Sequence, residues 1–456
     1  MIDTENDNVK NLASVMVFLV CLMPALATVL FGAVDPITWS LLYIVWAVTM
    51  AVWMWESSRR GGLPLASSSL LIPVVGLLIV GILQILPIPY FGSLNPSATF
   101  FFDLRLVVYL TFFAACLTFI DSEERLRRAV NFVIIFGALM AFYGILQRLA
   151  SSDGIYGLRH STQALPFGPF VNQHHFAAFM EMTGGLTLAL LFGESTSRDR
   201  RILLSLAAII MGAAVALTGS RGGLLSFVAA LALVVIFRLA AKKNEESERP
   251  ENKLALAAGG LGILMVIVVL VLYLGGNDQL MRGTGAALAN VDVSTGRFHF
   301  WPVALRIFLA HPLWGAGYDS FGVAFTRYDS WPGLARVEQA HNDYLQTLAD
   351  AGILGFACIA TFIFFLFKKG LAVVTQTHED RKYIAAGALA GCFGILVHSF
   401  FDFPLRTPSN AFFFLILATF ATAPVAFARR RRQRRGTPKL TADQQLEPSS
   451  RTATEK

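Results

Sequence analysis

His341 is the side chain whose position points most directly to chemistry. It opens the segment HNDYLQTLADAGILG, and its helical face would also carry Tyr344, Leu345 and Leu348. If His341 lies in the first turn of that helix, the helix dipole disfavours its protonated form. A neutral imidazole can act as a general base; the alternative is an interfacial histidine that only bonds nearby backbone.

Two arginines are candidates for binding phosphate. Arg221 lies in TGSRGG between two apolar runs, and a charge so close to hydrocarbon needs a partner or a function. The flanking glycines allow close approach to backbone amides that can cradle a phosphate. Arg297 begins RFHFWPVALRIF, a predicted amphipathic helix on the outer surface. The alternative is that such arginines extend to lipid headgroups.

Two more polar clusters lie beside predicted spans. The first is PFGPFVNQHHF, residues 166–176, and the second is HSFFDFPLR, residues 398–406. Within the second cluster, Asp402 and Arg406 are expected to pair with each other. Aromatic residues in both clusters suit either a membrane-interface belt or platforms for sugar rings.

Several kinds of site are missing from the sequence. There is no Gly-rich loop followed by Lys-Ser/Thr, no Gly-x-Ser-x-Gly elbow and no His-x-x-x-His pair. The four cysteines fall inside predicted spans without Cys-x-x-Cys spacing. We therefore expect no metal site and no cofactor, so acid–base chemistry must come from histidine, arginine and scattered carboxylates.

The elements that must position these residues are membrane-spanning helices. The 456 residues are 55% hydrophobic and 15% charged, whereas soluble domains have about 25% charged residues. Apolar runs near the ~20 residues needed to cross a bilayer recur along the chain. About twelve spans are predicted, at 12–33, 37–55, 68–87, 101–120, 129–148, 176–193, 202–218, 223–241, 254–274, 345–367, 383–400 and 410–428. The predicted fold is an all-α integral membrane protein.

Lysine and arginine indicate the orientation. With both termini cytoplasmic, about 27 of the 37 basic residues fall on the cytoplasmic side, as the positive-inside pattern requires. The remaining basic residues are all arginines: Arg105, Arg148, Arg159, Arg221, Arg282, Arg297, Arg306, Arg327, Arg336 and Arg406. Because a guanidinium grips phosphate through paired hydrogen bonds, this bias suits a phosphate-binding face. The alternative is a general preference of this chain for arginine, 28 against 9 lysines.

The predicted organisation is one membrane domain and a tail. Residues 1–428 form the polytopic domain, and a large outer loop at about 275–345, with short helices, separates spans nine and ten. Residues 429–456 are basic and then polar, which predicts a disordered cytoplasmic tail on anionic lipid. Membrane lipids are expected partners and nucleic acids are not.

The clusters resemble those of the O-antigen ligase and polysaccharide polymerase superfamily, which are bacterial inner-membrane glycosyltransferases. The matching stretches are FGPFVNQHHFAAFMEM, LTGSRGGLLSF, GRFHFWPVALRIFLAHPLWGAGYDSFG, AHNDYLQTLADAGILG and HSFFDFPLRTPSNA. They run from about residue 166 to 415, in the order that the family has. Relatives usually carry Asn-His where this chain has His174-His175, so His175 is the better equivalent and the role of His174 stays open.

The resemblance implies a metal-independent transfer on the periplasmic face by an all-helical fold similar to the GT-C class. The donor would be a glycan on undecaprenyl pyrophosphate. The acceptor hydroxyl would belong to a lipid A core sugar in a ligase, or to the growing lipid-linked glycan in a polymerase. His341 would be the base, and Arg221 and Arg297 would hold the pyrophosphate. The other motif residues expected to bind substrate are Asn172, His175, Asn342, Tyr344 and Arg406.

A polytopic transporter or lipid flippase is the alternative from another class. Such a protein should show two similar halves and polar residues at mid-membrane. Here the polar residues concentrate at the outer ends of the predicted spans and in one loop. The sequence therefore favours an enzyme at the membrane surface.

Overall fold

The computed structural model describes residues 2–59, 62, 65–87, 92–150, 154–161, 164–193, 196–243, 296–330, 337–377 and 380–425. The chain divides into two units, Met1–Ala426 and Phe427–Lys456, and the second lies outside the described residues. The described part of the first unit forms helices, and two isolated bridges close turns within it.

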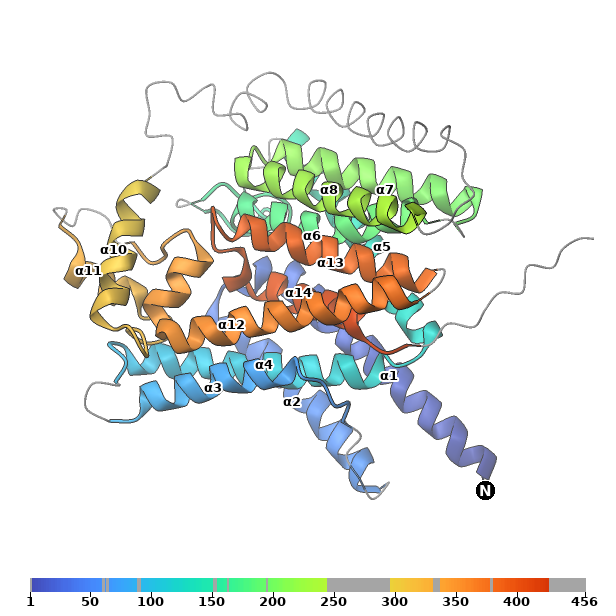
Figure 1. The fold of residues 1–456 in the computed structure, drawn as a ribbon, viewed down its shortest axis with the longest axis horizontal. Coiled ribbons are helices and arrows are strands. Elements are labelled where there is room, and N and C mark those ends of the chain that lie inside the picture. The colour runs from blue at the N-terminus through green and yellow to red at the C-terminus, as the bar shows by residue number, and fades with distance from the viewer. Residues whose placement is uncertain are drawn as a thin grey trace, which may run out of the picture. The chain divides into compact units, whose positions relative to one another are not determined.

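Within the described residues, eleven predicted spans coincide with helices (Figure 1). These helices are α1 (Ile2–Val29), α2 (Pro36–Arg59), α3 (Leu71–Ile85), α4 (Pro96–Phe119), α5 (Glu123–Leu149), α6 (Gln173–Leu191), α7 (Arg198–Leu217), α8 (Arg221–Lys243), α12 (Asp343–Gln376), α13 (Asp380–His398) and α14 (Pro408–Thr422). The predicted span at 254–274 lies outside the described residues. By length and composition, six of the described helices can cross a membrane: α2, α4, α5, α7, α8 (over Arg221–Ala240) and α12. The all-helical membrane class is thus confirmed, while the number of spans stays a prediction.

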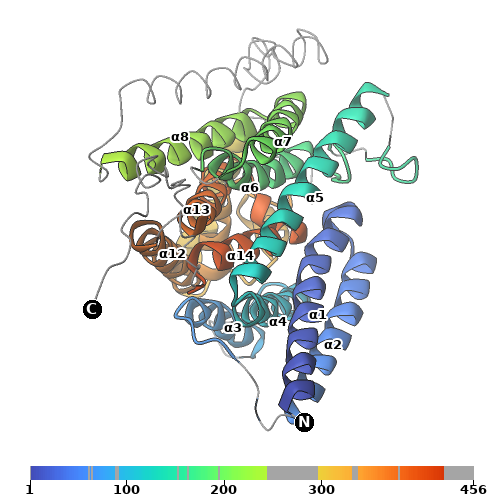
Figure 2. The same cartoon turned by 90° about the vertical axis from the view of Figure 1, so that its right-hand side faces the viewer.

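The centre of the bundle is built from α6, α13 and α14 (Figure 2). Every residue of α6 from His175 to Leu191 is buried. Small residues bring α6 and α13 together: a Cβ on Gly185 would lie 2.8 Å from the backbone nitrogen of Gly391. Such close approach is how helices associate where both their surroundings and their surfaces are apolar.

Helix α12 is broken at Gly352, whose φ of 63° and ψ of −164° are not helical. The broken turn bonds instead to the preceding loop, because Ile353 N donates to Pro312 O at 2.9 Å and Ala316 N donates to Ala349 O at 2.8 Å. A Cβ on Gly352 would collide with the backbone of Leu313. Glycine is therefore required at position 352 for two reasons, a positive φ and the close contact with the backbone of Leu313.

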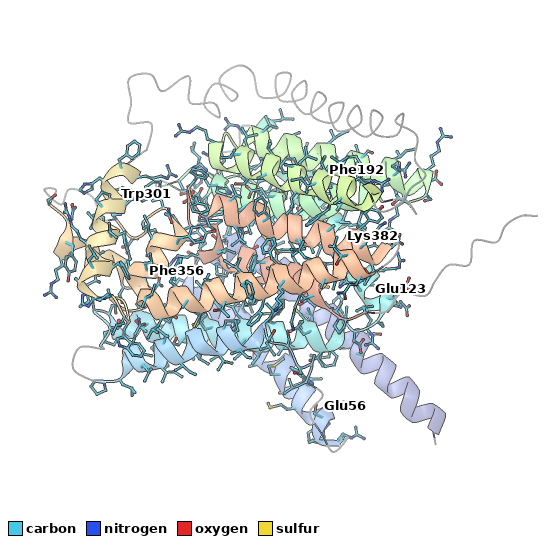
Figure 3. The ribbon with its side chains drawn as sticks, viewed as in Figure 1. Glu56, Glu123, Phe192, Trp301, Phe356 and Lys382 are labelled. Carbon is cyan, nitrogen blue, oxygen red and sulfur yellow. The ribbon has the colours of Figure 1, made fainter. Side chains whose placement is uncertain are left out.

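The described part of the predicted outer loop contains two short helices, α10 (Arg297–Ala310) and α11 (Phe321–Tyr328). The structure has a helix where the sequence predicts one, since α10 begins at Arg297 and buries Val303, Ala304 and Ile307. Its place on the outer surface stays a prediction. Figure 3 shows Trp301 of α10 at one end of the bundle and Lys382, near the start of α13, toward the other. Residues 275–295 and 331–336 of the loop lie outside the described residues.

Candidate active site

His341 and Asp402 form a hydrogen-bonded pair. His341 Nδ1 lies 3.0 Å from Asp402 Oδ1, and the same oxygen accepts a hydrogen bond from Phe403 N at 3.0 Å. The Asp402 side chain is 1% exposed, whereas that of His341 is 33% exposed. Because the carboxylate engages Nδ1, it fixes the ring and leaves Nε2 as the nitrogen that can meet a substrate.

The charge of Asp402 suits this role. Burial alone would raise the pKa of Asp402, but the hydrogen bond from His341 and the electrostatic effect of His174, His341 and His175 together outweigh it and hold the pKa below its usual range. Asp402 is therefore ionised at neutral pH. An ionised carboxylate stabilises the imidazolium that forms when the histidine accepts a proton.

His341 lies before α12, so it does not occupy the first helical turn, which was the condition for an effect of the helix dipole on its protonation. Asn342 is the N-cap, and its side-chain oxygen accepts hydrogen bonds from Tyr344 N and Leu345 N, both at 3.0 Å. His341 takes a φ of 51°, an unfavourable conformation for a non-glycine residue. The segment HND therefore caps the helix through its asparagine, and this cap turns the histidine out toward Asp402.

The expected pairing of Asp402 with Arg406 is wrong. Arg406 Nη2 instead donates to Asp350 Oδ2 at 2.6 Å, and Arg406 Nη1 lies 3.5 Å from Asp319 Oδ1. Phe403, with φ −121° and ψ 52°, interrupts the helical path before the 3-10 helix η3 (Pro404–Arg406). Residues four apart share a face only in a continuous helix, so the two side chains diverge.

Arg297 approaches the same carboxylate from α10. Arg297 Nη2 lies 4.0 Å from Asp402 Oδ2, and the arginine side chain is 18% exposed. Gly296 precedes α10 with a φ of 88°, a left-handed conformation that glycine adopts without strain. The structure thus brings together His341 and Arg297, 44 positions apart in the chain, through Asp402.

The starts of α6 and α8 also meet here. Asn172 is the N-cap of α6 and accepts a hydrogen bond from His174 N at 2.8 Å. His174 Nδ1 lies 2.8 Å from Ser220 Oγ. Ser220 directly precedes Arg221, which is the first residue of α8. Gly222 follows, and a Cβ there would be 3.2 Å from His398 Nε2. The half-buried Arg221 is therefore flanked by residues that contact two histidines of the site.

Of the two adjacent histidines, His174 faces the site. Its pKa is lowered to about 4, first of all by burial, so its imidazole is neutral at neutral pH. His175 is packed instead against Thr407, with Nδ1 2.7 Å from the hydroxyl, and against the Phe403 ring at 4.9 Å. The resemblance favoured His175 as the substrate-binding residue; the geometry favours His174.

Helices α6, α8, α10 and α12 thus all begin around the Asp402 carboxylate. The N-terminus of a helix carries partial positive charge and unpaired backbone N–H groups. Helix N-termini bind anions for this reason, and two of these four begin with an arginine. The arrangement can hold a multiply charged anion next to a histidine that is oriented for proton transfer.

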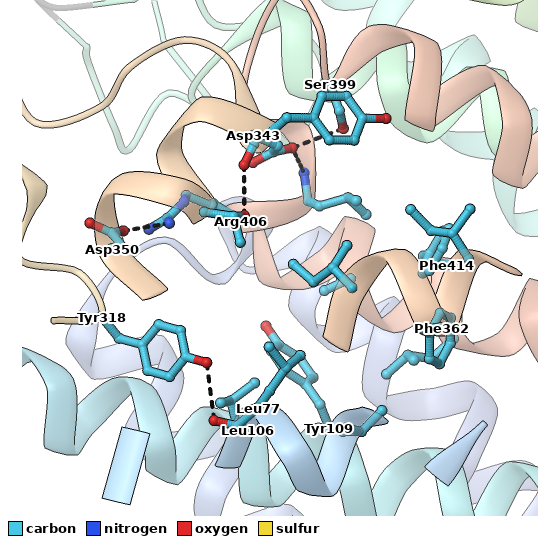
Figure 4. A pocket seen from close by; sticks show the side chains of 18 of the residues that line it. Leu77, Leu106, Tyr109, Tyr318, Asp343, Asp350, Phe362, Ser399, Arg406 and Phe414 are labelled. Atoms are coloured by element: carbon cyan, nitrogen blue, oxygen red, sulfur yellow. Dashed lines mark hydrogen bonds and ion pairs between the residues drawn. The ribbon is translucent and has the colours of Figure 1, made fainter. Parts of the chain in front are cut away.

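A cavity of about 220 Å³ is lined in part by Ser399, Leu405 and Arg406, from the loop that also carries Asp402 (Figure 4). Its polar end is formed by Asp343, Asp350, Ser399 and Arg406, and its apolar end by Phe362, Phe414 and neighbouring aliphatic residues. Two predicted substrate-binding residues, Tyr344 and Arg406, line this cavity. The Tyr344 hydroxyl donates to Leu396 O at 2.7 Å. Asn342, another residue that was predicted to bind substrate, donates a hydrogen bond to Phe400 O in addition to capping α12.

The sequence predicts no metal site, yet three possible ligands come close together in the structure. His174, His398 and Asp402 each offer a ligand atom, and these atoms lie within 4.8 Å of one another. Tetrahedral zinc ligands at about 2.0–2.2 Å from the ion lie about 3.3–3.6 Å apart, so this group meets the distance limit for a shared cation. The positive charge of Arg297 beside Asp402 opposes a second cation there. Sequence spacing missed the group because His174 comes from a segment 224 positions before His398.

Comparison with curated proteins found no match. A family model described as O-antigen ligase matches residues 206–360. The matched segment runs from α7 into α12 and contains Arg221, Arg297 and His341. Over this segment, about a third of the chain, the sequence is therefore similar to the O-antigen ligase family.

Proposed function

We propose that this membrane protein transfers a glycan from undecaprenyl pyrophosphate to an acceptor hydroxyl on the periplasmic face of the bacterial inner membrane, without a metal ion. The match to the O-antigen ligase family supports the general class, which is a ligase- or polymerase-like activity on lipid-linked glycans in surface polysaccharide biosynthesis. The single observation that carries the proposal is the convergence of four helix N-termini on the His341–Asp402 pair. A diphosphate is the anion that such a site would hold.

In this mechanism, His341 Nε2 accepts the proton of the acceptor hydroxyl. The acceptor oxygen attacks the anomeric carbon of the donor sugar, and the bond from that carbon to the diphosphate oxygen breaks. The electron pair of this bond goes to the diphosphate, whose growing charge is stabilised by Arg221, Arg297 and the helix N-termini. Asp402 stabilises the resulting imidazolium. A diphosphate leaving group needs cations rather than an acid that protonates it.

The proposed membrane arrangement follows from the same residues. It has about twelve spans over residues 1–428, both termini and the tail 429–456 in the cytoplasm, and the catalytic loop of about 275–345 in the periplasm. His341, Arg221 and Asp402 all lie at ends of helices that this arrangement assigns to the periplasmic side. The bias of arginine over lysine on that side supports it.

Purified full-length protein tests the proposed reaction directly. With undecaprenyl-pyrophosphate-linked glycan and a core acceptor, we expect glycosylated acceptor and free undecaprenyl pyrophosphate in equal amounts. EDTA should leave the rate unchanged, because arginines and helix dipoles neutralise the leaving group. A loss of activity that magnesium restores would refute the metal-free mechanism.

Deleting the gene separates the two family activities. If the protein is a ligase, lipopolysaccharide gels should show bare core while lipid-linked polymer persists. A product carrying a single repeat would identify a polymerase of the same superfamily instead. A normal ladder with missing exopolysaccharide would identify a polymerase of another glycan.

The cavity beside the site suits the first part of the donor's polyprenyl chain. Its lining is largely apolar, it lies among membrane helices, and its polar end adjoins the loop that carries Asp402. Arg406 there is already paired with Asp350 and Asp319, so this end is a poor diphosphate site. We therefore assign the polyprenyl chain of the donor to the cavity, and its diphosphate to the helix N-termini.

Filling the cavity should weaken binding of a long-chain donor. Ala411 lines it, and Ala411→Phe is expected to raise the KM for an undecaprenyl donor about tenfold by displacing buried apolar groups. A donor with only two isoprene units should be affected much less. Ile135→Phe, at a 60% exposed position of α5, is the matched control. Equal effects on both donors would contradict the assignment.

A further inference from the structure

Glu181 is a buried carboxylate to which the proposed mechanism gives no role. It lies in α6, is 0% exposed, and its Oε1 is 2.8 Å from Nδ1 of His398, which is 1% exposed. Its Oε2 has no hydrogen-bond partner among the described residues. A carboxylate buried among apolar helices is costly unless it is paired, so such residues commonly serve function.

The packing of three helices brings this pair to the site. Gly394 of α13 leaves room for α6 and α8, since a Cβ there would lie 3.5 Å from Glu181 Cβ and 3.3 Å from Ser226 O. Gly222, at the start of α8, similarly leaves room for the His398 ring. Two glycines thus let the imidazole reach from the core of the bundle to the Arg221 segment.

His398 also lies close to Asp402. A nitrogen of His398, a nitrogen of His174 and an oxygen of Asp402 lie within 4.8 Å of one another. Asp402 in turn bonds His341, so Glu181, His398, Asp402 and His341 form one row, which is buried except for the half-buried His341. In this row an imidazole lies between two carboxylates, which is where a positive charge is best compensated.

We propose that Glu181 and His398 are positioning residues that act on His341 through Asp402. Asp402 has two competing neighbours, the His341 imidazole at 3.0 Å and the Arg297 guanidinium at 4.0 Å. With His398 held by Glu181, the position of the carboxylate is fixed and it retains its bond to His341. When the pair is broken, Asp402 turns to Arg297, and His341 loses the contact that sets its tautomer and orientation. This inference rests on the proposed function.

A double-mutant cycle on the purified protein tests the proposal. We expect Glu181→Gln to lower kcat about 10- to 100-fold, the range for partners that orient catalytic groups. The donor KM should stay within about twofold, since neither residue contacts the donor. In an Asp402→Asn background, Glu181→Gln should change kcat by less than about twofold, because the orienting group is already lost.

Asp329→Asn is the matched control, since Asp329 also bonds a histidine, His299, at 2.7 Å but lies outside the row. Its kcat should stay near that of the wild type. If Glu181→Gln does not accumulate, His398→Asn replaces it in the same cycle. Melting temperatures of all variants detect a general loss of folding.

The outcomes separate the two proposals. Multiplicative effects of Glu181→Gln and Asp402→Asn, or an unchanged kcat in Glu181→Gln, would overturn the positioning role alone. A normal kcat in Asp402→Asn would instead overturn the base assignment on which the inference rests. The positioning role would also be overturned if the purified protein held one metal ion per chain and the His398→Asn variant lost that ion, since His398 and Asp402 would then be metal ligands.

Discussion

Replacing His341 by alanine is expected to lower the rate of glycan transfer about 10²- to 10⁴-fold, the usual contribution of a general base. The protein should still accumulate in the membrane, because the His341 side chain is one-third exposed and Asn342 performs the capping of α12. The donor KM should change little, since the arginines that grip the diphosphate remain. Turnover of the purified protein and surface glycan on gels both measure the effect.

His311→Ala is a suitable control for this variant. His311 ends α10 and lies 3.3 Å from the Tyr328 hydroxyl, outside the contacts of Asp402. We expect normal glycan from this variant. Near-normal glycan from His341→Ala as well would remove His341 as the base and leave the proposed mechanism without a proton acceptor.

Arg297→Lys and Arg221→Lys are expected to lower kcat/KM about 10- to 100-fold each, although both keep the positive charge. A lysine ammonium is a point donor, whereas the guanidinium can grip two diphosphate oxygens at once. The loss should be larger in kcat than in binding of the ground state, because charge on the diphosphate grows as the sugar leaves. Steady-state kinetics with varied donor measures both parts.

Arg306→Lys provides the control for these variants. It lies on the exposed face of the same helix α10, nine residues after Arg297. Full activity is expected there. If lysine at 221 and 297 were tolerated equally well, the arginines would be acting as general surface charge, and paired recognition of the diphosphate would be refuted.

The helices of this protein could be predicted from the sequence because their cause is local. An apolar run of about 20 residues has one favourable state in a bilayer, so each predicted span described by the structure lies on a helix. The start of α10 at Arg297 also depends on local sequence, since a glycine precedes the helix and apolar residues recur at helical spacing after it. The candidates His341, Arg221 and Arg297 were visible as polar residues beside apolar runs.

The partners of these residues depended on tertiary structure. Local spacing suggested that Asp402 pairs with Arg406, placed His341 inside α12, and left His174 without a role. In the structure, Asp402 contacts segments 61 and 105 positions away, and Glu181 meets a histidine 217 positions away. Hydrophobic periodicity states which residues are helical, but not which helix ends meet, because that depends on how glycines and large side chains fit across the bundle.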